Sequence, residues 1–363
     1  MDYSIFHQKV QLDFRFSART SRGVLENKFS WYIFIRDHHG VEGIGECAPL
    51  PGLSLEDGPD FEGKLEETLE RVRLRGKINV QLLKDLPALV PVGYSSLIFG
   101  LETAILDYLN GGKKIIFDNE FIRGRKIPIN GLVWMGDEAF MRSQVKEKIR
   151  NGFSTLKLKI GGIDFDRECS ILQGIRKRFS PAKLILRLDA NGSFSQPEAL
   201  AKLKTLSAYH IHSIEQPLEP GHSFLPELCK MSSIPIALDE ELIGKREGKE
   251  EWLKFIHPSY LILKPTLHGG LYGCKEWIGL AQKLQIGWWM TSALESNIGL
   301  NAICQFTVQY PILTTHGLGT GMLFKNNIPS PLEVSRGEIR YDPSKGWGDL
   351  FLDSRIPPSP GIP

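Results

Sequence analysis

The chain has 363 residues, a length that is enough for a large hydrophobic core and for two domains. Its composition is that of an ordinary globular protein, with 42% hydrophobic and 24% charged residues, and its net charge of +2 offers no basic surface for nucleic acid. It contains no run of about 18 apolar residues and begins without a signal-peptide pattern, so we expect a cytoplasmic protein with no membrane partner.

The first 125 residues predict an α+β domain. Three runs rich in aromatic and β-branched residues are typical of strands: 3–16, 30–38 and 40–49. Two stretches with helical periodicity follow them: 55–74 and 94–112. The stretch FSARTSRG, 16–23, is polar and is expected to form a loop.

From residue 126 to 330 the pattern changes to short apolar runs that alternate with amphipathic segments. The runs are 127–136, 155–162, 183–192, 211–218, 234–241, 259–270, 286–296 and 312–321. Successive βα units have about this spacing, and eight of them close most naturally into a (β/α)8-type TIM barrel. A doubly wound open sheet is the alternative, but no GxGxxG motif follows the first strand. The tail, 331–363, is expected to leave the barrel and return to the N-terminal domain.

Charged and polar side chains recur near the ends of these predicted strands. They are Lys157, Lys159, Asp189, Glu215, Asp239, Lys264, Ser292 and Glu295. Because the carboxyl ends of barrel strands converge on one face, we expect these groups around a single rim. In TLKLKIGG, 155–162, two lysines stand two residues apart, so both project to the same side of the strand.

The three carboxylates on neighbouring strands predict a metal site. Asp189, Glu215 and Asp239 would lie so close together that they could not all stay ionised without a cation. All-oxygen ligands without His or Cys favour Mg2+, with Mn2+ as the second candidate. The alternative is that each carboxylate caps a helix or pairs with Arg187 or a lysine, and recurrence on three successive strands argues against it.

The lysines predict acid–base chemistry beside that metal. An isolated lysine is a poor base at neutral pH, but a second lysine and a divalent cation nearby would lower its pKa toward neutrality. A lysine beside the α-carbon of a metal-bound carboxylate defines proton abstraction through an enediolate. Lys264 by itself would equally suit an anchor for a carboxylate or a phosphate, and Lys157 a structural role.

The constellation resembles the enolase superfamily and, within it, the muconate lactonizing enzyme subgroup. The motifs that carry the resemblance are LKLK, LDAN, IEQP, LDEE and LKP. The resemblance implies an α+β capping domain followed by a modified TIM barrel of the type (β/α)7β. It also implies that Mg2+ binds to Asp189, Glu215 and Asp239.

Three further segments are similar to the o-succinylbenzoate synthase family: 45–57, 291–306 and 316–333. This resemblance implies syn-elimination of water from a small carboxylate, 2-succinyl-6-hydroxy-2,4-cyclohexadiene-1-carboxylate, in menaquinone biosynthesis. It implies that Lys159 removes the α-proton and then protonates the departing hydroxide. Lys157 would tune that base, and Lys264 would stabilise the enediolate from the opposite face.

Weaker candidates surround these residues. Substrate contacts are expected from Asn191, Arg187, Ser292, Glu295, Gly319 and Thr320. Contacts from capping loops are expected from Ser17, Arg19, Thr20, Arg22 and Leu53. Rim packing, a helix cap or a solvated loop would explain each of them equally well.

Three other functions fit part of the pattern. A racemase or epimerase of the same subgroup, acting on N-succinylamino acids or dipeptides, would use Lys159 and Lys264 as two bases. Dipeptide epimerases would need paired acidic residues that HGLGTG, 316–321, lacks. A Schiff-base aldolase would use Lys264 without a metal, which leaves the carboxylates unexplained. A non-catalytic barrel would not need the charged strand ends.

Overall fold

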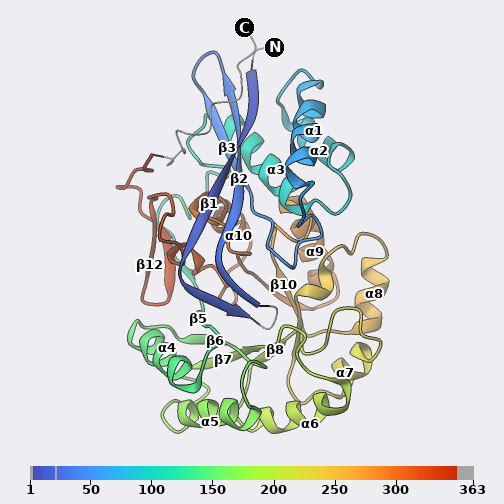
Figure 1. Cartoon of the computed structure of the whole chain (residues 1–363), viewed down its shortest axis with the longest axis vertical. Coiled ribbons are helices and arrows are strands. Elements are labelled where there is room, and N and C mark those ends of the chain that lie inside the picture. The colour runs from blue at the N-terminus through green and yellow to red at the C-terminus, as the bar shows by residue number, and fades with distance from the viewer. Residues whose placement is uncertain (1–2, 21–22, 350–363) are drawn as a thin grey trace.

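The computed structural model describes residues 3–20 and 23–349, and the side chain of Thr20 lies outside this description (Figure 1). An antiparallel sheet with three helices stands above a curled parallel sheet that is surrounded by helices. The predicted fold class, an α+β capping domain with a (β/α)7β barrel, is confirmed. No helix in the described part of the chain is long and apolar enough to cross a membrane.

The capping domain is built on a long antiparallel hairpin. Its sheet has the order β1-β2-β3 and consists of β1 (Tyr3–Thr20), β2 (Gly23–Asp37) and β3 (Glu42–Cys47). Its helices are α1 (Phe61–Arg73), α2 (Val80–Leu89) and α3 (Ser95–Leu109). Gly43 and Gly45 let α3 lie directly on β3, because a Cβ at Gly45 would stand 1.9 Å from the carbonyl oxygen of Gly100. Apolar side chains of the sheet and the helices then share one core.

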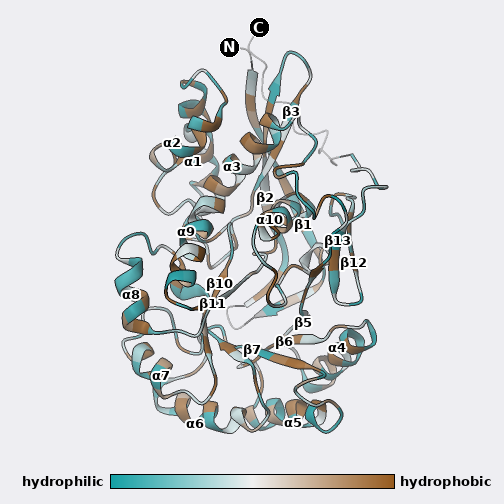
Figure 2. Cartoon of the chain, turned by 180° about the vertical axis from the view of Figure 1, so that it is seen from behind, coloured by the Kyte–Doolittle hydropathy of each residue, from teal (hydrophilic) through white to brown (hydrophobic). Residues whose placement is uncertain are grey.

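The barrel sheet has seven parallel strands in sequential order. They are β5 (Gly131–Val133), β6 (Thr155–Lys159), β7 (Ile185–Asp189), β8 (Ser213–Glu215), β9 (Ile236–Leu238), β10 (Tyr260–Leu263) and β11 (Gly287–Met290). The helices outside are α4 (Glu138–Arg150), α5 (Phe165–Arg176), α6 (Gln196–Ser207), α7 (Leu225–Met231), α8 (Lys249–Ile256), α9 (Gly270–Lys283) and α10 (Asn297–Thr307). Figure 2 shows hydrophobic residues along the strands, and both hydrophobic and hydrophilic residues on the helices. This mixture is expected for helices that bury one face against the sheet.

The barrel is closed by two bridge residues rather than by a regular eighth strand. His316 bridges to Ile129, and Gly317 bridges to Thr291 at the other edge of the sheet. The predicted strand at 312–321 is therefore too long. The predicted strand at 127–136 is two strands, because β4 (Ile127–Pro128) leaves the barrel sheet and pairs with β13 (Glu338–Tyr341).

The C-terminal segment begins with a hairpin of β12 (Leu332–Ser335) and β13 that stands against β4. Farther along, Trp347 packs against a cluster that contains Tyr32 and Phe34 of β2. The segment thus contacts both the barrel side and the capping sheet. Residues 350–363 lie outside the described part of the chain.

Two expectations for the capping domain are corrected. The segment 17–20 is the end of β1 rather than a loop, since its backbone pairs with β2 in a hairpin that runs down to the barrel (Figure 1). The pairing shifts register between Asp13 and Ala18, where the hairpin is irregular. The helix expected from residue 55 begins only at Phe61, and α2, which contains Pro87, was not predicted.

The two domains are joined by a buried carboxylate. Glu102 of α3 accepts hydrogen bonds from the backbone N–H groups of Leu271 and Tyr272, at the first turn of α9 in the barrel. Gly270 leaves room for it, because a Cβ there would stand 2.3 Å from Glu102 Oε2. Burial raises the pKa of Glu102 to about 7, although the two backbone hydrogen bonds oppose the shift.

We expect this carboxylate to make the protein less stable as the pH rises. The pKa of Glu102 is raised from 4.5 to about 7, so between these values the folded state binds more protons than the unfolded state. The free energy of unfolding therefore falls across this window, by about 3 kcal/mol for a shift of this size. Urea unfolding at pH 5 and pH 8 measures it. Glu102→Gln keeps an acceptor for α9 and should reduce the difference, whereas an unchanged difference would contradict the assignment.

Candidate active site

The barrel strands place six charged side chains on the inner face. The parallel register sets Lys157 beside Arg187, Lys159 beside Asp189, and Asp189 beside Glu215. Alternation along each strand then directs residues two apart to the same side. All six side chains are buried, with exposed fractions of at most 8%: Lys157, Lys159, Asp189, Glu215, Asp239 and Lys264.

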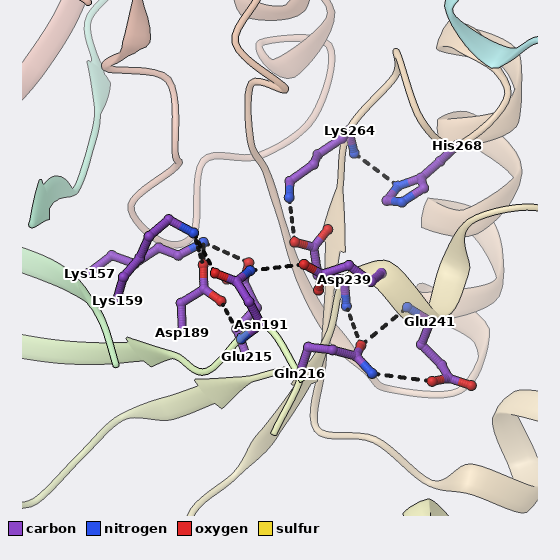
Figure 3. Close-up of polar contacts among 11 residues, drawn as sticks. Lys157, Lys159, Asp189, Asn191, Glu215, Gln216, Asp239, Glu241, Lys264 and His268 are labelled. Carbon is purple, nitrogen blue, oxygen red and sulfur yellow. Dashed lines mark hydrogen bonds and ion pairs between the residues drawn. The ribbon is translucent and has the colours of Figure 1, made fainter. Parts of the chain in front are cut away.

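These side chains contact one another directly (Figure 3). Lys157 Nζ lies 2.6 Å from Glu215 Oε1 and 2.9 Å from Asp189 Oδ2. Lys159 Nζ lies 3.0 Å from the same Asp189 oxygen, and Lys264 pairs with Asp239. Lys264 stands on the other side of the carboxylates from the lysine pair, so the cluster has cations at both ends.

The two lysines of the doublet differ in electrostatics. Burial disfavours the charge of Lys157, but Asp189 and Glu215 outweigh it and raise the pKa above its ordinary value. Burial lowers the pKa of Lys159, and the neighbouring Lys157 lowers it further against the opposing effect of Asp189. The lysine with the lowered pKa is thus the one at the outer end of β6.

The carboxylates fit a divalent cation in their chemistry. Asp239 Oδ1 is buried and has no hydrogen-bond partner among the described residues. Burial and the neighbouring carboxylates Asp189 and Asp239 raise the pKa of Glu215. The raised pKa indicates that the three carboxylates have too little positive charge around them. Within the described part of the chain, no group of three or more His, Cys, Asp or Glu side chains has an arrangement that could hold a metal ion. The lysine ammonium groups are instead paired with carboxylate oxygens that a hard cation would take.

A cavity of about 380 Å3 opens above this cluster. Its floor includes Lys157, Lys159, Asp189, Asn191 and Lys264. The capping domain supplies the cover, from the hairpin and from the loop that follows β3: Phe16, Gly23, Val24, Leu25, Leu50, Pro51 and Gly52. Apolar side chains from both domains therefore shield the charged floor from water.

Some predicted contact residues line this cavity. They are Asn191, Ser292, Gly319 and Thr320. Asn191 accepts a hydrogen bond from Lys159 Nζ at 2.7 Å and donates to Glu240 Oε1 at 2.9 Å. Thr320 donates to Ser292 Oγ at 2.7 Å, and Ser292 in turn donates to Glu295. Glu295 itself is fully buried behind the wall, outside the set of described lining residues.

Arg187 does not belong to the described lining of the cavity. Its guanidinium donates to Thr315 O at 2.8 Å and Thr314 Oγ1 at 2.6 Å, and it lies 3.8 Å from the centre of the Trp289 ring. The side chain faces the barrel interior, as predicted from its spacing. Its hydrogen bonds go to the segment that closes the barrel, and its contact with substrate stays a prediction.

The predicted capping residues lie farther out. Arg19 and Leu53 line an open groove that continues from the cavity, with which it shares Gly23, Val24, Gly52 and Asn191. Ser17 is exposed and donates to Glu26 Oε1 at 2.5 Å. The side chain of Thr20 and all of Arg22 lie outside the described residues.

Several site residues were missed by sequence reasoning. Glu240 and Gln216 directly follow two of the carboxylates, and Gln216 Oε1 accepts from the backbone N–H of Glu241 at 3.2 Å. His268 Nδ1 accepts from the backbone N–H of Lys264 at 3.0 Å. Trp134 has its ring 5.9 Å from Lys159 Nζ. Gln216 and Glu240 could have been found from the sequence, because they are polar and directly follow the predicted carboxylates. The contact of Trp134 could not, because it depends on how the strands pack.

Most of this chain is similar to proteins of a known family. Residues 140–351 match the family model of enolase C-terminal domain-like proteins. An o-succinylbenzoate synthase from Desulfotalea psychrophila is 43% identical over 91% of this chain and 97% of its own length. The crystal structure of MenC from the same organism has a TM-score of 0.83 at 40% identity, covering 94% of this chain and all of that one.

A more distant solved structure shares the fold. A dipeptide epimerase from Cytophaga hutchinsonii, complexed with Mg and the dipeptide D-Ala-L-Val, has a TM-score of 0.82 at 20% identity and covers 97% of this chain and 98% of its own. Fold and site together define an enzyme of the enolase type. The chain belongs to the enolase C-terminal domain-like family and, within it, to the o-succinylbenzoate synthase family.

Proposed function

We propose that this protein is an o-succinylbenzoate synthase. It removes water from 2-succinyl-6-hydroxy-2,4-cyclohexadiene-1-carboxylate by syn-elimination and yields 2-succinylbenzoate, a step in menaquinone biosynthesis. The relative at 43% identity has this name and matches nearly the whole chain. The observation that carries the chemistry is the lysine doublet set against Lys264 across three buried carboxylates.

The reaction needs one base on one face of the substrate. Neutral Lys159 takes the proton from the carbon that bears the carboxylate, and the electron pair of that bond passes into an enediolate. The neighbouring C–O bond then breaks, the ring becomes aromatic, and the departing hydroxide takes the proton back from Lys159 as water. The lysine is regenerated, and no oxidant or reductant is consumed.

The other residues of the floor support this step. The ammonium group of Lys264, on the opposite side, stabilises the negative charge of the enediolate. Asn191 holds Lys159 Nζ at 2.7 Å, and Lys157 stabilises the anionic carboxylates. Asp189, Glu215 and Asp239 are the proposed ligands of Mg2+, with Mn2+ as the second candidate. A bound divalent cation supplies Lewis-acid stabilisation of the substrate carboxylate.

A second candidate is racemization of N-succinylamino acids. It needs a base on each face of the α-carbon, and Lys159 and Lys264 stand on opposite sides of the floor. The succinyl group is common to both substrates, so one cavity would serve both reactions. A small carboxylate is the only partner that we propose, and the cytoplasmic location remains a prediction from the sequence.

The test supplies the cyclohexadiene substrate with Mg2+ and follows the loss of the diene absorbance. In parallel, N-succinylamino acids are incubated in D2O and exchange of the α-proton is followed by NMR. Rapid dehydration supports the synthase. Rapid exchange without dehydration would put the racemase in its place, and borohydride trapping of Lys264 with a carbonyl substrate would indicate an aldolase.

A further inference from the structure

A lysine of the capping domain is buried at the wall of the cavity. Lys28 of β2 is only 1% exposed, although it contributes neither to the lysine doublet nor to the described lining of the cavity. Its Nζ donates to the carbonyl oxygen of Leu294 at 3.1 Å and to that of Ala48 at 3.3 Å. The first acceptor belongs to the barrel and the second to the loop that follows β3. Lys28 therefore connects two segments that lie on different domains.

Both segments form the wall of the cavity. Leu294 lines it from the barrel, and Leu50, Pro51 and Gly52, just after Ala48, line it from the capping domain. Burial lowers the pKa of Lys28, and the carboxylates Glu46 and Glu295 oppose the shift. Its two hydrogen bonds, one to a carbonyl oxygen of each wall, fix the position of Nζ between them.

Leu294 has a backbone conformation that needs support. Its φ angle is +66°, in the left-handed region, which a bulky side chain seldom adopts. Two hydrogen bonds hold the peptide groups around it, since its N–H donates to Ser292 Oγ at 3.1 Å and its carbonyl accepts from Lys28. The first bond is local, and the second comes from the other domain.

This conformation decides where the side chain of Leu294 points. It is directed into the cavity and packs with the cluster that joins the hairpin to the barrel, which includes Phe14 and Trp134. Without the bond from Lys28, the turn can relax to a negative φ and withdraw the side chain. The wall would then lose an apolar surface beside the substrate.

We infer that Lys28 is a positioning residue that holds Leu294 in its left-handed conformation and thereby shapes the substrate cavity. It acts through Leu294 and does not touch the reacting atoms. Its effect should therefore appear in substrate binding and leave the proton transfer at Lys159 unchanged. The expected change in KM rests on the proposed function, while the conformation of Leu294 does not.

The kinetic test compares three variants. Lys28→Met should raise KM for the cyclohexadiene substrate about 10-fold or more, the factor that a hydrogen bond from a charged group corresponds to, with kcat within about 3-fold of wild type. Leu294→Ala should raise KM similarly. In the double variant, Lys28→Met should add no further increase, because its effect passes through Leu294. Multiplying effects would overturn the inference, and so would an unchanged KM in Leu294→Ala, which can be measured even if Lys28→Met does not fold.

A matched control separates positioning from stability. Lys249 is also buried, at 9% exposure, and pairs with Glu276 on the outside of the barrel. Lys249→Met should lower Tm and leave KM unchanged. An equal rise of KM in this variant would show that general destabilisation explains the result for Lys28.

A crystal structure of Lys28→Met tests the inference without turnover. We expect φ of Leu294 to become negative and its side chain to leave the cavity wall. An unchanged Leu294 would overturn the inference whatever the enzyme catalyses. If the wild-type protein does not dehydrate the cyclohexadiene, the proposed function fails, and this structural result still decides the role of Lys28.

Discussion

Lys159→Ala is expected to lower kcat for dehydration by about 100- to 10,000-fold, the usual contribution of a general base. The side chain lies at the outer end of β6, where Asn191 Oδ1 accepts from Nζ at 2.7 Å and the Trp134 ring lies 5.9 Å away. These contacts hold Nζ above the floor, and Asp189 Oδ2 lies 3.0 Å from it. The measurement is the initial rate of loss of diene absorbance at saturating substrate and Mg2+.

Lys159→Arg separates the base from the ion pair. Arginine retains a cation beside Asp189 but keeps its proton at any physiological pH, so we expect kcat to fall about as far as in the alanine variant. Lys202→Ala serves as the control, because Lys202 pairs with Glu198 on α6 and has no place in the cavity. Turnover near the wild-type rate in Lys159→Arg would exclude Lys159 as the base.

Removal of divalent cations with EDTA is expected to abolish turnover, and added Mg2+ to restore it. Asp239→Asn should weaken Mg2+ binding by at least the roughly 10- to 100-fold that the loss of a supporting group costs. Asp239 is fully buried, its Oδ1 has no hydrogen-bond partner among the described residues, and its other carboxylate oxygen pairs with Lys264, so Oδ1 is the oxygen that is available to a cation. Titration of the rate with Mg2+ measures the change.

Thermal unfolding measures the binding of Mg2+ without depending on enzyme activity. Binding to the folded state alone stabilises it by about 2.7 kcal/mol at a Mg2+ concentration 100 times Kd, so Tm of the wild type should rise. The rise should be lost in Asp239→Asn and kept in Asp164→Asn, since Asn caps α5 as well as Asp does. Full activity in EDTA, with no effect of Mg2+ on Tm, would refute a metal site.

Local patterns in the sequence were sufficient to predict the positions of the charged groups. Alternation in TLKLKIGG placed two lysines on one face, and the recurrence of one carboxylate per βα unit placed Asp189, Glu215 and Asp239 on adjacent strands. Strand alternation and repeat spacing are properties of residues that are near one another in the sequence. They do not depend on what the strands pack against. The inward direction of Arg187 was predictable for the same reason.

Contacts between distant segments could not be predicted in this way. Arg187 donates hydrogen bonds to Thr314 and Thr315 across the barrel, more than 120 residues away in the sequence. No pattern in the residues around Arg187 predicts these partners. The hairpin end at 17–20 looked like a loop because its polar residues resemble those of turns. Its pairing with β2, and its reach over the barrel, depend on the packing of the two domains.

By itself, then, the sequence determined the barrel, the six charged strand-end residues and the class of reaction, because side-chain spacing and chemical type are local quantities. Only the tertiary structure decided which ammonium pairs with which carboxylate, how β4 leaves the barrel sheet, how the bridges at His316 and Gly317 close the barrel, and how Lys28 reaches Leu294. Each of these depends on the distance between residues far apart in the chain. That distance is set by the packing of whole elements, which no short stretch of sequence contains.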